Sequence, residues 1–160
     1  MIQYRTFRKK DAEAVKNVAM ESWKYIYKDI FSLDKIENFV EKNYSIDGLV
    51  KLLPRIESGE MFFSVVLDDN QIIGFCNIAD GGQGMRILRI YLLPDYFRKG
   101  IGKKLLELGE GFIKSKNVRK YFCFVNEKNE IGINFYEKNG FIHMLERDKE
   151  GEWYMEKSLE

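Results

Sequence analysis

Hydrophobic and polar positions divide the chain into a helical N-terminal third and a strand-rich remainder. Residues 2–7 alternate between apolar and polar side chains as a strand does, and Asp11 is placed to cap the helix that follows. Apolar residues then recur at helical spacing over 15–26, from 32 to 44, and from 46 until Pro54 disturbs the pattern. These three segments are predicted to be helices.

Beyond residue 60 the pattern changes to short apolar runs separated by turn residues. The runs MFFSVVL and QIIGFCNIA flank residues 68–70, which predicts a β-hairpin, and three glycines lead into a strand at 85–93. After a helix that extends to about residue 116, we expect a strand at 119–125 and a helix at 130–138 that stops at Gly140. A last hairpin is expected from 141–147 and 152–157. The order favours a mixed α/β (α+β) fold in one domain spanning residues 1–160.

Composition narrows the class of protein further. The net charge of +1 gives no support to binding of nucleic acid or of a membrane surface. No apolar run reaches the ~20 residues that a membrane helix needs, and the N-terminus lacks the apolar core of a signal peptide, so we expect a cytoplasmic protein. Cys76 and Cys123 lie in apolar, strand-like runs, which favours reduced thiols in the core over a disulfide. No metal site is predicted.

A short basic loop before the helix at 101–116 gives the first indication of chemistry. Gly100 and Gly102 permit close approach of the backbone to a ligand, and unpaired N–H groups at a helix N-terminus attract anions. Four basic residues surround them: Arg98, Lys99, Lys103 and Lys104. The pattern predicts a polyphosphate ligand. A P-loop would need Gly at 97 and Ser or Thr at 104, and a dinucleotide loop a third glycine at 105, so both fail; a merely solvated helix start is the alternative.

A second constellation follows at residues 125–141. The run VNEKNEIGINFYEKNGF ends a strand, crosses a short helix and closes on Gly140. Together, YLLPDYFRKGIGKKLL and N-x-x-G-x-x-FYEKNGF resemble the acetyl-CoA-binding core of the GCN5-related N-acetyltransferases, the GNAT superfamily. The resemblance implies a central mixed, mostly antiparallel twisted sheet, splayed at the acetyl-CoA site and flanked by helices. It also implies transfer of acetyl from acetyl-CoA to a primary amine by direct attack.

The resemblance assigns cofactor contacts residue by residue. The main chain of Ile90, Tyr91 and Leu92 would pair with the pantetheine arm, and Asn129 and Lys138 match positions that contact the cofactor in the family. The pyrophosphate would be held by the backbone N–H groups of Arg98, Lys99, Gly100, Ile101, Gly102 and Lys103. A helix cap is the alternative role for Asn129, and a solvated side chain the alternative for Lys138.

One position departs from the family pattern. The family usually has Arg or Gln where this chain has Phe97, so no side chain from that position anchors the phosphates. Arg98 would substitute only after a rearrangement of the loop, and stronger reliance on Lys99 or Lys103 is an equal alternative. The departure keeps open a non-catalytic, CoA-binding regulatory module as an alternative function.

Tyr136 is the predicted catalytic residue, because it matches the family tyrosine that protonates the leaving thiolate. A purely structural tyrosine is the alternative. The attacking amine must lose a proton, but no base can be identified from the sequence. The single histidine, His143, lies at an apolar strand start and is predicted to be structural.

The segment from residue 21 to 45 gives the sequence evidence on the acceptor amine. Trp23 and Tyr27 lie one helical turn apart with acidic residues nearby, and the stretch resembles PaiA-type polyamine acetyltransferases. An aromatic slot with carboxylates suits a polycation such as spermidine or spermine through cation–π and ionic contacts. The alternatives are a core role for Trp23, and acetylation of peptide or protein amines. A homodimer is common among similar proteins.

Overall fold

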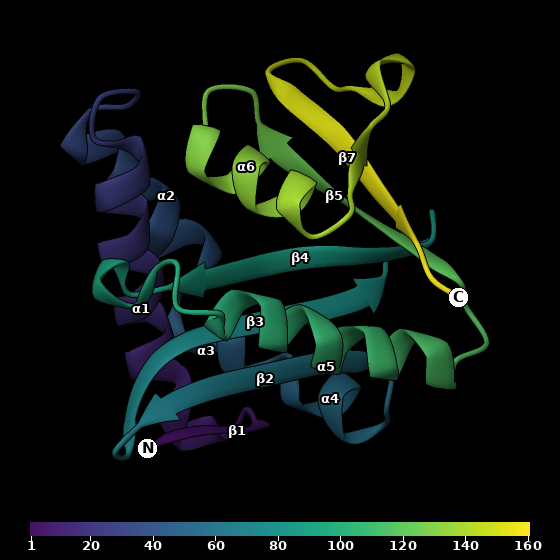
Figure 1. Cartoon of the computed structure of the whole chain (residues 1–160). Helices are drawn as coiled ribbons and strands as arrows, with labels where there is room; N and C mark the ends of the chain where they lie inside the picture. The colour runs from purple at the N-terminus through teal and green to yellow at the C-terminus, as the bar shows by residue number, and fades with distance from the viewer.

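The computed structural model describes residues 1–160 and is built on one seven-stranded sheet with helices on both faces (Figure 1). The strand order is β1-β2-β3-β4-β5-β7-β6, and β4–β5 is the one parallel pair. The strands are β1 (Ile2–Thr6), β2 (Met61–Asp68), β3 (Gln71–Asp80), β4 (Met85–Leu92), β5 (Lys120–Asn126), β6 (Ile142–His143) and β7 (Glu152–Ser158). The expected mixed, mostly antiparallel sheet is confirmed.

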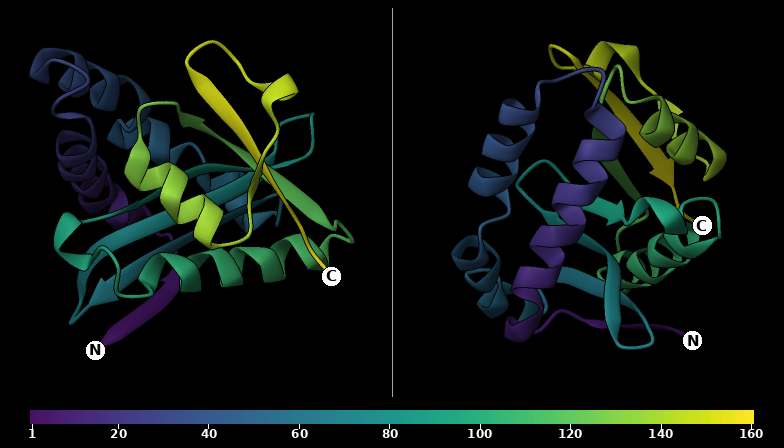
Figure 2. Two further views of the ribbon diagram at one scale, coloured as in Figure 1. Left: turned by 45° about the horizontal axis from the view of Figure 1, so that its top comes forward. Right: turned by 90° about the vertical axis from the view of Figure 1, so that its left-hand side faces the viewer.

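Helices form a layer on each side of the sheet, as the right-hand view of Figure 2 shows. They are α1 (Ala12–Tyr27), α2 (Leu33–Asn43), α3 (Ile46–Val50), α4 (Leu53–Glu57), α5 (Ile101–Ser115) and α6 (Glu130–Lys138). Two apolar cores of equal size result, one beneath α1 and α2 and one beneath α5 and α6. Alternation along the strands explains this division, since Val65 enters the first core and its neighbour Val66 the second.

The sheet opens between its two central strands. A single register pair, Arg86 with Phe122, joins β4 to β5, whereas β4 stays paired with β3 as far as Leu92. The β3–β4 ladder also contains an irregularity: Ile78 pairs with Ile87 and Asn77 with Arg89, which leaves one extra residue in β4. Such a bulge bends a strand and increases its twist. The edge of β4 beyond Arg86 is therefore free on the side that faces β5.

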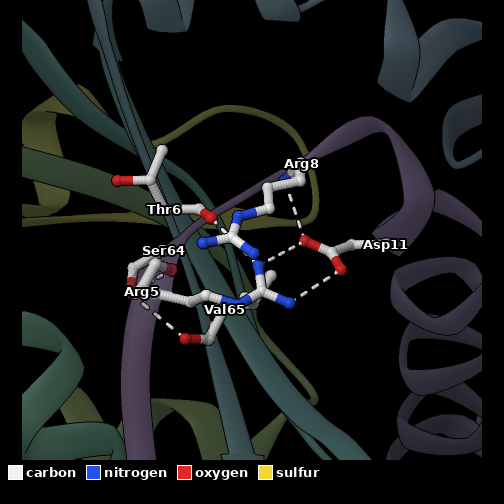
Figure 3. A network of polar contacts seen from close by, with 6 residues as sticks. All are labelled: Arg5, Thr6, Arg8, Asp11, Ser64 and Val65. Carbon is white, nitrogen blue, oxygen red and sulfur yellow. Dashed lines mark hydrogen bonds and ion pairs between the residues drawn. The ribbon is translucent and has the colours of Figure 1, made fainter.

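Asp11 does not cap α1 as the sequence suggests. It occupies the N-cap position, but its carboxylate makes no capping bond. Instead Asp11 accepts two hydrogen bonds from the Arg5 guanidinium, at 2.7 and 3.0 Å, and one from the Arg8 backbone N–H at 2.8 Å (Figure 3). The ion pair ties the first strand to the first helix because a charged donor competes better for a buried carboxylate than helix amides do.

Two further segments differ from the sequence expectation. Pro54 does not merely disturb the third helix but lies in the first turn of a new one, α4, where its missing N–H carries no cost. The expected strand at 141–147 is reduced to the two residues of β6, followed by a 3-10 turn. That chain bends around Asp148, whose carboxylate accepts from the Tyr154 backbone N–H at 2.7 Å and contacts His143 Nε2 at 2.9 Å.

The remaining expectations concern residue types. Cys76 and Cys123 are buried and unpaired, as predicted. His143 is held structurally between the Asp148 carboxylate and the Trp153 ring, whose centroid lies 3.9 Å from its own. None of the helices combines the length and apolarity that a membrane span requires.

Candidate active site

The loop from Pro94 to Gly100 turns from β4 into α5 and leaves a row of backbone donors without partners. Its first three residues, Pro94–Tyr96, form a 3-10 turn, and Gly100 takes a left-handed φ of 81° as the N-cap of α5. The N–H groups of residues 98–103 donate to no group of the protein, and no side chain caps the helix. Six consecutive free donors at the positive end of a fifteen-residue helix fit a pyrophosphate.

The two glycines of this loop serve different purposes. A Cβ added to Gly100 would meet nothing within 4 Å, so this side of the loop is open to a ligand. At Gly102 the same atom would lie 2.7 Å from Phe135 Cε1 of α6. Gly102 therefore permits close contact between α5 and α6, a packing role that the sequence expectation of ligand approach did not include.

Phe97 has a structural explanation. Its ring packs edge-on against Tyr25 of α1, with the centroids 5.6 Å apart. The contact fixes the phosphate-binding loop to the first helix through aromatic packing. Arg98, which follows, adopts a left-handed φ of 62° and is exposed. Phe97 thus packs the loop against α1, and the backbone donors of the loop remain available.

The basic side chains around the loop are exposed. Arg98, Lys99 and Lys103 all face solvent, and Lys99 Nζ lies 5.5 Å from the Tyr96 ring centroid. Lys138 is exposed at the C-terminal end of α6. None of the four forms a salt bridge with a carboxylate of the chain, so their charge remains available to a polyanion.

Three tyrosines from different elements lie close enough to influence one another electrostatically near the opening between β4 and β5. They are Tyr27 at the end of α1, Tyr91 in β4 and Tyr136 in α6. Burial raises the pKa of each, and the electrostatic influence of Tyr91 adds to the shifts of Tyr27 and Tyr136. All three hydroxyls consequently stay protonated at neutral pH. The main chain of Ile90, Tyr91 and Leu92 borders the same opening, and their side chains are half-buried.

Tyr136 is held by the core beneath α6. It is 8% exposed, and its ring packs edge-on against Phe135 and Phe141 at 5.4 and 5.2 Å between centroids. The hydroxyl lies beside the Cys123 thiol, whose own pKa is raised by burial. Since burial raises the pKa of Tyr136 well above its ordinary value, the hydroxyl stays neutral at pH 7 and can donate a hydrogen bond, while the higher pKa makes it a weaker acid than an exposed tyrosine.

Asn129 caps α6 and joins it to α1. Its Oδ1 accepts from the Gly132 backbone N–H at 2.8 Å, and its Nδ2 donates to the Tyr27 hydroxyl at 3.3 Å. The side chain is 7% exposed. Asn129 thus positions the helix that carries Tyr136, and any contact it makes with a cofactor comes in addition to this capping role.

Trp23 and Tyr27 lie in the core beneath α1 and α2. Trp23 is 9% exposed and Tyr27 4%, with ring centroids 4.2 Å apart, and Phe39 stacks on the other side of Trp23 at 4.1 Å. Burial leaves little ring surface for a cation. Both rings therefore belong to the apolar core, which is the alternative that the sequence left open for Trp23.

Glu152 at the start of β7 is a candidate residue that the sequence did not reveal. It pairs in register with Asn126 at the end of β5 and is half-buried. Its carboxylate belongs to the charges that raise the pKa of both Tyr27 and Tyr91, so it acts electrostatically on both hydroxyls. Glu152 forms no salt bridge with a basic side chain of the protein. An unpaired carboxylate here can attract a cation or accept a proton.

Comparisons with known proteins agree with this geometry. The Acetyltransferase (GNAT) family model matches residues 19–141. A protein of Thermoplasma acidophilum named spermidine N(1)-acetyltransferase is 34% identical over 160 residues, covering 99% of this chain and 98% of its own.

Solved structures extend the likeness to three dimensions. The PaiA N-acetyltransferase of Thermoplasma acidophilum, crystallised in complex with coenzyme A, superposes with a TM-score of 0.93 at 33% identity over 99% of both chains. A GNAT-family acetyltransferase of Staphylococcus aureus reaches a TM-score of 0.74 at 18% identity over 100% of both chains, which shows the fold alone. With a splayed sheet, a free row of amides at α5 and a matching family model over most of its length, the chain belongs to the acetyltransferase (GNAT) family.

Proposed function

We propose that this protein is an acetyl-CoA-dependent N-acetyltransferase whose acceptor is a primary amine of a polyamine such as spermidine. The row of six free backbone donors at the start of α5 carries the proposal, because it fits the pyrophosphate of CoA. The likeness to a spermidine acetyltransferase over the whole chain supports the acceptor class. We take residues 1–160 as one N-acetyltransferase domain, since one sheet spans both termini.

The geometry supports the following cofactor contacts, which are part of the proposal. The amides of residues 98–103 hold the pyrophosphate, with Arg98, Lys99, Lys103 and Lys138 adding positive charge around it. The free edge of β4 at Ile90–Leu92 pairs with the pantetheine amides, because β5 leaves it without a partner. Acetyl-CoA, when bound, supplies the acetyl group as an activated thioester.

Proton transfer is divided between two sides of the opening. Tyr136 Oη, kept protonated by burial, donates to the departing sulfur. Glu152, on the side of Tyr27 and Tyr91, attracts the cationic amine and accepts its proton directly or through water. For an amine of pKa ~10.4, loss of the proton to bulk solvent at pH 7 costs about 4–5 kcal/mol, so the carboxylate serves to relay the proton to water and not to hold it.

The function is tested by thiol release from acetyl-CoA over a panel of amines. Spermidine and spermine are expected to be acetylated with the highest kcat/KM, ahead of lysyl peptides and small arylamines. Faster turnover of peptides would identify a peptide or protein acetyltransferase instead. Tight CoA binding without turnover of any amine would indicate a regulatory module. Phe97 was the residue that suggested such a module, and its packing against Tyr25 accounts for it in another way. Size-exclusion chromatography tests whether the chain forms the homodimer that is common among similar proteins.

A further inference from the structure

A cavity of about 400 Å³ lies on the face of the sheet beneath α2, between α2, α4 and the first half of β4. We call it the arginine pocket, because Arg55, Arg86 and Arg89 line it together with Asn43, Tyr44 and Leu88. No aspartate or glutamate is among its lining residues. The volume is within the range of small-molecule sites.

The bulge in β4 explains why three side chains of one strand face this pocket. Met85 and Ile87 point into the core beneath α5, so the intervening Arg86 points to the other face. The extra residue after Ile87 then breaks the alternation, and both Leu88 and Arg89 line the cavity. The irregularity that opens the sheet also gathers two guanidinium groups on one side.

Two of the three arginines of the pocket, Arg86 and Arg89, form no ion pair with a carboxylate of the chain. Arg86 has a buried Nε that bonds to nothing, and its guanidinium lies 5.0 Å from the Phe124 ring centroid. Arg89 lies 5.1 Å from the Tyr44 ring centroid and donates only to the Asn43 carbonyl oxygen, at 3.3 Å.

Arg55 is the third cation and the one that has a carboxylate partner. Its Nε is 3.7 Å from Glu60, in a pair that is exposed on both sides. The aromatic rings and the backbone carbonyl hold the other two guanidinium groups in place without neutralising them. Fixed, unneutralised arginines with a buried free donor match an anion that accepts several hydrogen bonds.

We propose that the arginine pocket binds a small anion bearing carboxylate or phosphate groups, and that this anion binds together with the amine acceptor. Tyr44 connects the pocket to the opening, since its ring lies 6.1 Å from that of Tyr91. Guanidinium groups without a counterion would repel a polycation entering beside Tyr91. A bound anion removes this repulsion and favours the cationic acceptor.

Calorimetric titration of the full chain tests the site directly. The protein is first saturated with CoA, so that the loop at α5 cannot take up the added anion. Inorganic phosphate and succinate are then titrated separately at constant ionic strength, which distinguishes phosphate from carboxylate ligands. Saturable binding of at least one probe at one site per chain is expected, weakened about tenfold or more by Arg86→Gln and by Arg89→Gln. The matched control, Arg119→Gln, removes an exposed arginine outside the pocket and leaves the affinity unchanged.

Each outcome of the titration either supports or overturns the proposed anion site. Absence of saturable binding of both probes, or equal weakening by Arg119→Gln, overturns the proposal. If Arg86→Gln unfolds the protein, Leu88→Glu places a negative charge in the same cavity at a partly exposed position and must abolish binding. A kinetic arm rests on the proposed function: the occupied site should lower KM for spermidine, and competitive inhibition would overturn joint binding. Failure of catalysis alone leaves the calorimetric result standing, so the two proposals fail independently.

Discussion

Replacing Gly102 by alanine distinguishes a packing glycine from a ligand-approach glycine. The new Cβ would lie 2.7 Å from Cε1 and 3.0 Å from Cζ of Phe135. Both distances are shorter than the ordinary contact of about 3.5–4.0 Å between carbon atoms. The Phe135 ring, which is half-buried between α5 and α6, must therefore move.

The expected magnitude follows from two opposing effects. Overpacking at a buried position costs about 1–3 kcal/mol, whereas alanine in place of glycine in a helix gains at most about 1 kcal/mol. The free energy of unfolding should thus fall by about 1–2 kcal/mol. Because roughly 2–4 °C of Tm corresponds to each kcal/mol in a chain of this size, the melting point should drop by about 2–8 °C.

A double-mutant cycle in urea provides the assay. Gly102→Ala is measured in the natural background and in Phe135→Ala, where the colliding ring is gone. In the second background the substitution should be neutral or stabilising, giving a coupling of about 1–3 kcal/mol. CoA affinity in the doubly substituted protein should stay near its value in Phe135→Ala, since the residue 102 amide is retained. Equal destabilisation in both backgrounds would refute the packing explanation.

Four other substitutions have specific expected results. Tyr136→Phe should lower kcat by about 10²-fold or more with little change in CoA affinity; an unchanged kcat in stopped-flow thiol release removes Tyr136 from catalysis. Gly100→Leu should weaken CoA binding in calorimetry, with a fold cost of about 1–2 kcal/mol from its left-handed backbone; full affinity would count against the loop as the pyrophosphate site. Glu152→Gln should raise KM for spermidine, while Glu150→Gln, an exposed neighbour, should not; equal effects would exclude a specific role for Glu152. Burial alone would raise the pKa of Asp11, but its hydrogen bonds with Arg5 and the Arg8 amide lower it; the stabilisation is therefore present above the unfolded pKa near 3.8 and is lost as pH falls through the lower folded value. Asp11→Asn should cost about 1.5–3 kcal/mol at pH 7 and flatten the acid limb of a urea–pH series, whereas an unaltered limb would contradict this linkage.

Local patterns predicted most of the elements, because they depend on residues close in sequence. The helix at 130–138 and the hairpin around Asp69 and Asn70 follow from a cap and a turn, and the structure gives both turn residues a positive φ. The ion pair of Asp11 with Arg5 was missed, since a capping position does not reveal a competing partner on a strand.

The candidate site likewise has parts that the sequence predicts and parts that only the folded structure reveals. The loop at 98–103 was predicted because its glycines and basic residues lie close together in the sequence. Glu152 was not, since it meets Tyr27 and Tyr91 only after distant strands and a helix pack together. The β4 bulge was equally hidden, because an unpaired residue leaves the apolar composition of a strand unchanged. Phe97 departs from the family pattern in the sequence, and only its contact with Tyr25 in the structure gives a reason for an aromatic residue there.

The single register pair between β4 and β5 also bears on how the molecule loses its structure. It divides the hydrogen-bonded ladder into a four-stranded part and a three-stranded part, linked across the gap by few direct bonds such as that from Asn129 to Tyr27. Partial opening along this seam requires fewer broken ladder bonds than opening within either part, so amide exchange should report two cooperative units. A ligand that contacts both units stabilises the closed sheet, so bound cofactor should suppress the separate opening of the two units.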